Sequence, residues 1–254
     1  MKVCTTKSEL REALAEGGGT LGLVMTMGAL HAGHLSLVRE ARERADRVLA
    51  TIFVNPEQFG PGEDLDKYPR TLEADLAALR EAGVDVVYAP SAEEVYPHPP
   101  RVRILPGAAS AVLEGDLRPG HFQGVLQIVG KVLALAQPDF AVFGQKDAQQ
   151  FVNVRQMGED LDLPVQLLEA PIVRDDDGLA LSSRNRYLTE QERGDALALS
   201  RALTAGAGAA QSGDPAAQVV RAAAEVLEAC PGVQPQYVAL ALENTFEVVA
   251  IWTP

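Results

Sequence analysis

The sequence contains little lysine and little cysteine. Among its 254 residues the only lysines are Lys2, Lys7, Lys67, Lys131 and Lys146, so a lysine inside a motif is informative. The two cysteines, Cys4 and Cys230, lie far apart and form neither a CxxC pair nor a Cys/His cluster. We therefore expect two free thiols in a reducing compartment rather than a disulfide or a metal site.

Long apolar runs are absent as well. No stretch reaches the length of about 18 apolar residues that a membrane span needs, and the polar first ten residues lack the apolar core of a secretory signal. We expect a cytoplasmic protein. The formal net charge is −13, with 35 acidic against 22 basic residues, which argues against binding to nucleic acid or anionic lipid. An anionic substrate would need a local cationic site.

Apolar runs alternate with helical patterns through most of the chain. Strands are predicted at 21–25, 48–54, 84–88, 140–143 and 165–168, and helices at 34–45, 72–82, 125–136 and 147–157. This alternation predicts an α/β fold with a parallel sheet, whose ligands bind beyond the carboxyl ends of the strands. Residues 1–172 would form that domain. Residues 173–254 would form a smaller α+β domain, with helices at 189–205 and 216–229 and strands at 237–242 and 248–252.

A glycine-rich segment with two histidines follows the first predicted strand. Glycine allows close approach to a ligand, and the start of a helix favours phosphate, to which an imidazole can donate a hydrogen bond. A helix start with incidental histidines and a zinc site are the alternatives, although the Glu and third ligand of a zinc motif are missing. We expect nucleotide binding by Met27, Gly28, Ala29, Leu30, His31, Ala32, Gly33 and His34.

Neutral amides follow the second strand. Asn55 and Gln58 can contact a hydroxyl and a carboxylate without neutralising them, although Asn55-Pro56 is also a common turn. Further along, Arg118 and His121 flank a Pro-Gly turn that could be a mobile basic lid or a solvated turn.

Two later segments combine cations with small polar groups. Lys146 lies between a strand and a helix, where its charge suits phosphate oxygens; Asp147 could orient it, contact a ribose or cap the helix. Ser182, Ser183 and Arg184 could clamp a triphosphate. Because the chain has no Walker A motif and no GxGxxG, these elements would have to hold any nucleotide.

Taken together, these motifs resemble the pantoate–β-alanine ligase family within the HxGH nucleotidyltransferase superfamily. HxGH alone indicates the superfamily, whereas FVNPxQF, RPGHF, GxKDxQQ and SSRN in this order are specific to the ligases. The resemblance runs from residue 21 to about residue 193 and implies a Rossmann-like domain, a smaller C-terminal domain and a homodimer. The implied reaction joins (R)-pantoate and β-alanine through a pantoyl-adenylate, giving pantothenate, AMP and pyrophosphate from ATP with Mg²⁺.

The resemblance also implies roles for individual residues. His34 would be the proton donor, with His31, Lys146 and Arg184 as further catalytic groups. Asn55, Gln58 and Gln150 would bind the substrate acid. Further ATP contacts would come from Gly144, Gln145, Lys146, Asp147, Val173, Leu181, Ser182, Ser183 and Arg184.

The chain departs from the family pattern at Met25, where Pro is usual, at Gln127, where Thr is usual, and in its short tail. Two other hypotheses compete with a ligase. One is a nucleotidyltransferase that stops at a dinucleotide product, and the other is a nucleotide-binding regulator without activity. The neutral amides favour the ligase, because a second phosphate would need more cations.

Overall fold

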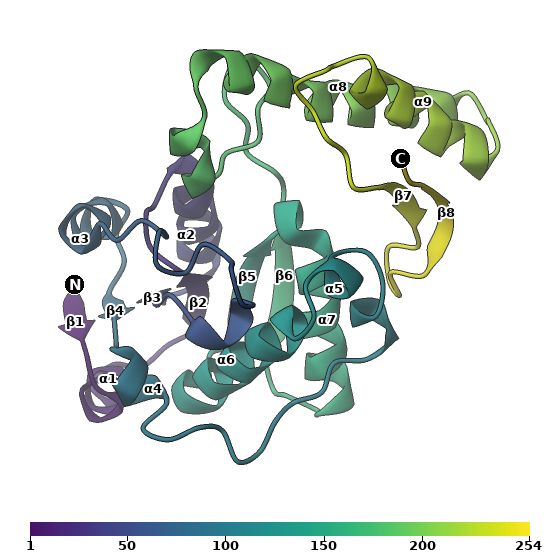
Figure 1. The fold of residues 1–254 in the computed structure, drawn as a ribbon. Coiled ribbons are helices and arrows are strands. Elements are labelled where there is room, and N and C mark those ends of the chain that lie inside the picture. The colour runs from purple at the N-terminus through teal and green to yellow at the C-terminus, as the bar shows by residue number, and fades with distance from the viewer. The chain divides into compact units, whose positions relative to one another are not determined.

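The computed structural model describes residues 1–254 and divides into two compact units, Met1–Ile172 and Val173–Pro254. The first unit is built on a parallel six-stranded sheet of order β1-β4-β3-β2-β5-β6 (Figure 1). Its strands are β1 Lys2–Cys4, β2 Leu21–Thr26, β3 Arg47–Ile52, β4 Val86–Tyr88, β5 Phe140–Gly144 and β6 Gln166–Ala170. The predicted α/β fold is confirmed.

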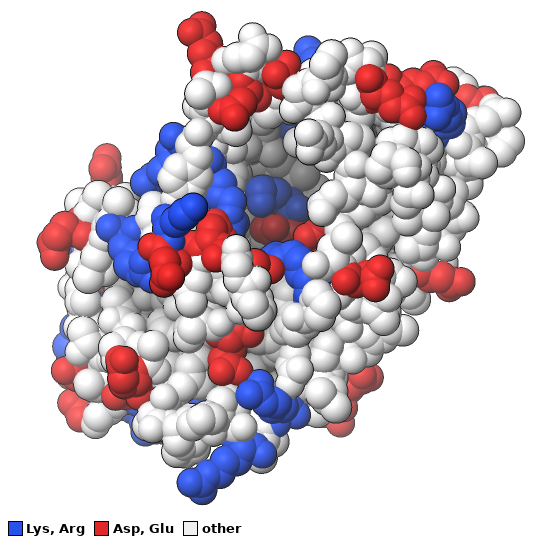
Figure 2. All heavy atoms as spheres, in the orientation of Figure 1, with Lys and Arg blue, Asp and Glu red and all other residues white.

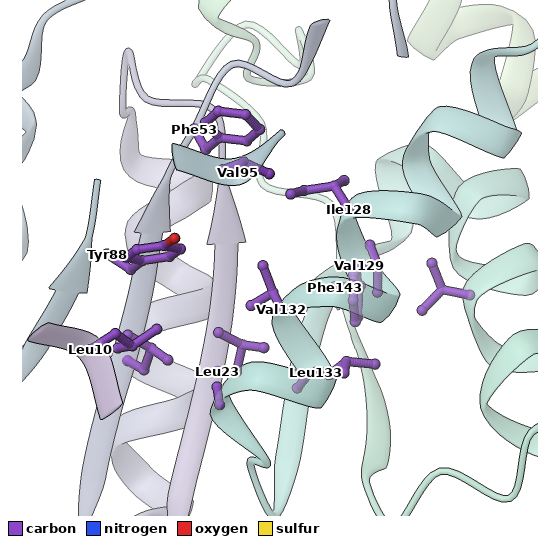
Figure 3. Close-up of a cluster of buried hydrophobic side chains, with 14 of the residues drawn as sticks. Leu10, Leu23, Phe53, Tyr88, Val95, Ile128, Val129, Val132, Leu133 and Phe143 are labelled. Carbon is purple, nitrogen blue, oxygen red and sulfur yellow. The ribbon is translucent and has the colours of Figure 1, made fainter. Parts of the chain in front are cut away.

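Helices cover both faces of this sheet. The α-helices of the first unit are α1 Lys7–Ala15, α2 Ala32–Arg44, α3 Leu72–Glu81, α4 Ala92–Val95, α5 Glu114–Leu117, α6 His121–Ala136 and α7 Ala148–Asp160. Side chains alternate across a strand, so the neighbours Leu23 and Val24, both fully buried, belong to different apolar clusters. The cluster of Leu23 packs against α1, α6 and α7, and Figure 3 shows part of it. The cluster of Val24 packs against α2 and α3.

The N-terminal strand and helix were not predicted from the sequence. β1 has only three residues at the sheet edge, and only Cys4 of these is buried, so it lacks an apolar run. α1 begins after Thr6, whose side chain accepts the backbone N–H of Glu9 while Glu9 bonds back, which forms a capping box. That Thr-x-x-Glu spacing is the signal that would have revealed the helix.

The second unit contains α8 Glu190–Gln211, α9 Ala216–Glu228 and an antiparallel pair, β7 Val238–Ala241 with β8 Val248–Trp252. The two helices pack through small side chains, with Ala198 and Ala202 of α8 against Ala223 and Leu227 of α9. α8 extends to Gln211, six residues beyond the predicted end at 205. Alanine is a strong helix former, so the Ala-rich segment continues the helix despite its glycines.

Acidic and basic side chains are interspersed on the face that Figure 2 shows, without one continuous basic surface. None of the helices combines the length and the apolar character that crossing a bilayer requires.

Candidate active site

The turn after β2 has a left-handed backbone that a buried carboxylate holds in place. Gly28 has φ +82° and Ala29 has φ +51°, a conformation that is uncommon for a residue with a side chain. The carboxylate of Asp75 in α3 is 3% exposed. It accepts the backbone N–H groups of Ala29 at 2.9 Å and Leu30 at 2.8 Å. Asp75 thus shapes the segment that leads into the two histidines, a role that no local sequence motif indicates.

His31 and His34 lie together at the start of α2. His31 is the N-cap, with its Nδ1 accepting the backbone N–H of Gly33 at 3.2 Å. Nδ1 of His34 accepts the backbone N–H of His31 at 3.4 Å, and the ring centroids are 4.0 Å apart. Burial, followed by the neighbouring His31 and Lys146, lowers the pKa of His34 to about 3. His34 is therefore neutral near pH 7, with its proton on Nε2, and can donate a hydrogen bond to a ligand rather than present a cation.

Lys146 lies in the loop after β5. Its side chain is 42% exposed, and its Nζ donates to Asp147 Oδ1 at 3.3 Å. Asp147 precedes α7 but makes no side-chain capping bond, so capping does not explain this residue. A side chain at Gly144 would meet no atom within 4 Å, so open space lies beside the backbone there. Gln145 and Lys146 are exposed and Gly144 is half-buried.

The loop after β3 is held by Asn55, which is 1% exposed. Its Nδ2 donates to the backbone oxygen of Gly124 at 3.0 Å and to Gln58 Oε1 at 3.2 Å. Its Oδ1 accepts the Tyr96 hydroxyl at 3.0 Å and the backbone N–H of Glu57 at 3.3 Å. The polar atoms of Asn55 are thus occupied within the protein, and one of its bonds orients the amide of Gln58.

Gln58 is further anchored from its other side. Its Nε2 donates to Met27 Sδ at 3.1 Å, and its backbone oxygen lies 2.8 Å from His121 Nδ1. Because a carbonyl can only accept, Nδ1 of His121 carries a proton, and Nε2 can accept from Arg118, whose Nη1 is 3.2 Å away. Arg118 pairs with Glu63 through two bonds of 2.9 and 2.6 Å. The Pro-Gly turn is therefore tied to the loop after β3, and Arg118 does not lie free in solvent.

A cavity of about 160 Å³ lies at the carboxyl ends of the strands. Its polar lining comes from loops on both sides of the β2–β5 pair. The chain order of the sheet reverses between these two strands, and ligands of open α/β sheets bind at such a point. Apolar side chains, including Phe53, Val125 and Phe143, form the remaining wall. The polar or partly polar residues that line it include Thr26, Met27, His34, Asn55, Gln58, Tyr68, Asp147 and Gln150. The cavity suits a small organic acid, since its volume is below the roughly 300–1,000 Å³ of pockets that bind drug-sized ligands.

The remaining predicted ATP contacts, Val173 and the segment Leu181 to Arg184, belong to the second compact unit. The backbone N–H of Leu181 donates to Val173 O at 3.0 Å, so the structure brings these two together. Ser182 caps a short 3₁₀ turn, η4 Ser183–Tyr187, by accepting the backbone N–H of Arg184 at 3.2 Å. Ser183 is buried and Arg184 is exposed.

Of the departures from the family pattern, Gln127 has a structural role: its Oε1 accepts the backbone N–H of Ile104 at 3.3 Å and anchors the preceding loop. Met25 lines the cavity. No group of three or more His, Cys, Asp or Glu side chains is placed to hold a metal ion.

This chain is similar to pantoate-beta-alanine ligases and pantothenate synthetases in both sequence and fold. A family model for pantoate-beta-alanine ligase matches residues 2–252. A pantothenate synthetase of Acidothermus cellulolyticus is 52% identical over 247 residues, 97% of this chain and 81% of that protein. The crystal structure of pantothenate synthetase from Thermus thermophilus is 47% identical with a TM-score of 0.94, covering 100% of this chain and 91% of that one. A Francisella tularensis pantoate-beta-alanine ligase, complexed with beta-gamma ATP and beta-alanine, is 28% identical with a TM-score of 0.79, covering 100% and 97%.

Proposed function

The chain belongs to the pantoate–β-alanine ligase family and joins pantoate to β-alanine, and we propose that the reaction proceeds through a pantoyl-adenylate formed from ATP. The observation that carries this proposal is the cavity at the β2–β5 junction. Its polar lining pairs neutral amides, Gln58 and Gln150, with the donor His34. The Francisella relative, whose structure holds beta-gamma ATP and beta-alanine, supports ATP and β-alanine as the other reactants.

In the first step a carboxylate oxygen of pantoate attacks the α-phosphorus of ATP. The P–O bond to the β-phosphate breaks, and pyrophosphate leaves with its electron pair. Negative charge grows on the phosphates, so the site needs donors already in place. We assign this task to Lys146 and to the neutral Nε2–H of His34, with His31 as a further donor. Gln58 and Gln150 hold the acid without neutralising the attacking oxygen.

In the second step the neutral amine of β-alanine attacks the acyl carbon, and AMP leaves. Adenylation makes this step possible, because a free carboxylate would have to expel oxide. The amine loses a proton to solvent as the C–N bond forms. Holding the amine close to the adenylate supplies most of the remaining acceleration. The products are pantothenate and AMP.

We propose different roles for the side-chain amides of Asn55 and Gln58. Gln58 contacts pantoate directly. Asn55 acts as a positioning residue, since its own polar atoms bond within the protein while its Nδ2 orients Gln58.

ATP would contact Met27 to His34, Gly144 to Asp147, Val173, and Leu181 to Arg184, as the family resemblance implies. Residues 1–172 would form the nucleotide- and pantoate-binding domain, and residues 173–254 the smaller C-terminal domain. Mg²⁺ would enter as the MgATP substrate, held by phosphates and water. We further propose a cytoplasmic homodimer.

Isotope exchange between pyrophosphate and ATP tests the intermediate. Exchange that requires pantoate and proceeds without β-alanine is expected, because the adenylate forms before the amine enters. Exchange that is independent of pantoate would contradict the proposal. A product analysis with β-alanine present supplies the second readout: AMP and pantothenate are expected, and a stable dinucleotide product would reject the ligase chemistry.

A further inference from the structure

A second cavity, of about 260 Å³, lies between α1 and α6. It shares a wall with the candidate active site, since the same side chains line both cavities: Tyr88, Val95, Ile128 and Val132. These residues lie within the apolar cluster that Figure 3 shows. The shared wall of the second cavity is therefore mostly apolar, and the proposed ligase reaction does not use this cavity.

Three cations line this cavity, and no acid does. Lys7 and Arg11 are four residues apart on α1, hence on one helical face, and Lys131 projects from α6. None of the three side chains forms an ion pair. Lys131 Nζ lies 5.3 Å from the centre of the Tyr96 ring. The nearby carboxylate of Glu94 is engaged by the backbone N–H of Lys7 at 2.8 Å.

The three cations stand out on a protein of net charge −13. Burial, and then repulsion from Lys7, lowers the pKa of Lys131. Like charges placed together beside an apolar space, without an ion pair to any side chain of the protein, favour an anion supplied from outside.

Tyr88, which lines both cavities, provides a separate observation. Its side chain is 2% exposed, yet its hydroxyl has no hydrogen-bond partner. Figure 3 shows the hydroxyl on the side of the ring that faces Val95 and Val132. A buried polar group without a partner is unfavourable, and such groups often mark a place where a ligand or water binds.

We propose that this cavity binds a small organic anion, with its carboxylate at Lys7, Arg11 and Lys131 and its apolar body against Val95, Ile128 and Val132. The occupant would be a small monocarboxylate with an apolar chain. This inference does not depend on the adenylate mechanism, because no residue assigned to catalysis contributes a charge to the cavity.

Calorimetric titration of the full chain with hexanoate tests the proposal. We expect saturable binding that weakens by about tenfold or more in the double variant Arg11→Gln/Lys131→Gln, because charge-assisted contacts are lost. Hexan-1-ol has the same apolar body without the charge and should bind at least about tenfold more weakly. The matched control Lys2→Gln removes a surface lysine on the neighbouring strand and should leave the dissociation constant unchanged.

A second pair of variants separates this cavity from the active site, which also accepts a carboxylate in our proposal. Gln58→Ala/Gln150→Ala should leave hexanoate binding intact. Loss of binding in that variant, together with retention in Arg11→Gln/Lys131→Gln, would place hexanoate in the active site and overturn the inference. Absence of saturable hexanoate binding to the unmodified chain would overturn it as well.

Discussion

The carboxylate of Asp75 accepts the backbone N–H of Ala29 at 2.9 Å, which links α3 to the left-handed turn in front of His31 and His34. Asp75→Ala leaves the N–H groups of Ala29 and Leu30 without this partner. We expect a loss of about 2–4 kcal/mol in the free energy of unfolding, since these are buried bonds to a charge. We also expect a raised KM for ATP. Urea unfolding and steady-state kinetics measure both, with exposed Glu73→Ala on the same helix as control. Unchanged kinetics in a folded Asp75→Ala protein would mean that the turn keeps its shape without the hydrogen bonds to Asp75.

Lys146→Ala should slow adenylate formation by on the order of 10², as the loss of one preorganised donor commonly does. Pyrophosphate–ATP exchange measures this step without the second half-reaction. Lys2→Ala, which removes a distant exposed lysine, serves as the control. Near-normal exchange in Lys146→Ala would remove this residue from the proposed chemistry.

Gln58→Ala should raise the KM for pantoate by about tenfold or more while changing the KM for ATP little, because a single substrate contact is lost. Gln218→Ala, an exposed glutamine of α9, is the matched substitution outside the site. Equal increases in both KM values would show that Gln58 supports the loop rather than the acid.

The pKa of His34, held at about 3 by burial, makes stability depend on pH. An unfolded histidine titrates near 6.5, so between about 6.5 and 3 the unfolded chain binds a proton that the native chain excludes. The free energy of unfolding should therefore fall with decreasing pH, by up to about 1.4 kcal/mol per pH unit from this one group. His34→Gln should give a shallower slope in this window, and exposed His98→Gln should not. Parallel slopes for His34→Gln and the unmodified protein would exclude this origin.

The close approach of α6 to the loop after β3 predicts a clear difference between two glycines. A Cβ at Gly124 would lie 2.0 Å from the backbone oxygen of Glu57, whereas a Cβ at Gly208 would meet nothing within 4 Å. Gly124→Ala should destabilise the protein by about 1–3 kcal/mol or more through overpacking. Gly208→Ala should stabilise it by about 1 kcal/mol, because alanine favours the interior of α8. Thermal unfolding of both variants checks the signs, and a stable Gly124→Ala protein would show that the loop can move aside.

Most of the parallel sheet could be predicted from the sequence because its inner strands are buried on both faces. A strand such as β2 must then be apolar at nearly every position, and it appears as a run. β1 could not be found in this way, since an edge strand of three residues needs few apolar side chains. The extension of α8 was missed because an Ala/Gly-rich composition has no helical periodicity to detect.

The sequence predicts which kinds of residue lie around the cavity, but not which of these residues form hydrogen bonds with one another. The HxGH and GxKD segments follow strands that are neighbours in the sheet, so their convergence follows from topology. Asn55 resembled a substrate contact because it is an amide in the right loop. Its burial depends on Gly124 and Tyr96, which lie 69 and 41 residues away, and local sequence does not indicate those contacts.

The hydrogen bond from Ala29 to Asp75 has a practical consequence for protein design. The conformation of the HxGH turn is enforced by a side chain 46 positions further along the chain. A peptide that carries only this motif, or a foreign scaffold that receives it without α3, would lack the anion that closes the turn. Grafting experiments should therefore transfer the aspartate-bearing helix together with the histidine loop as one unit.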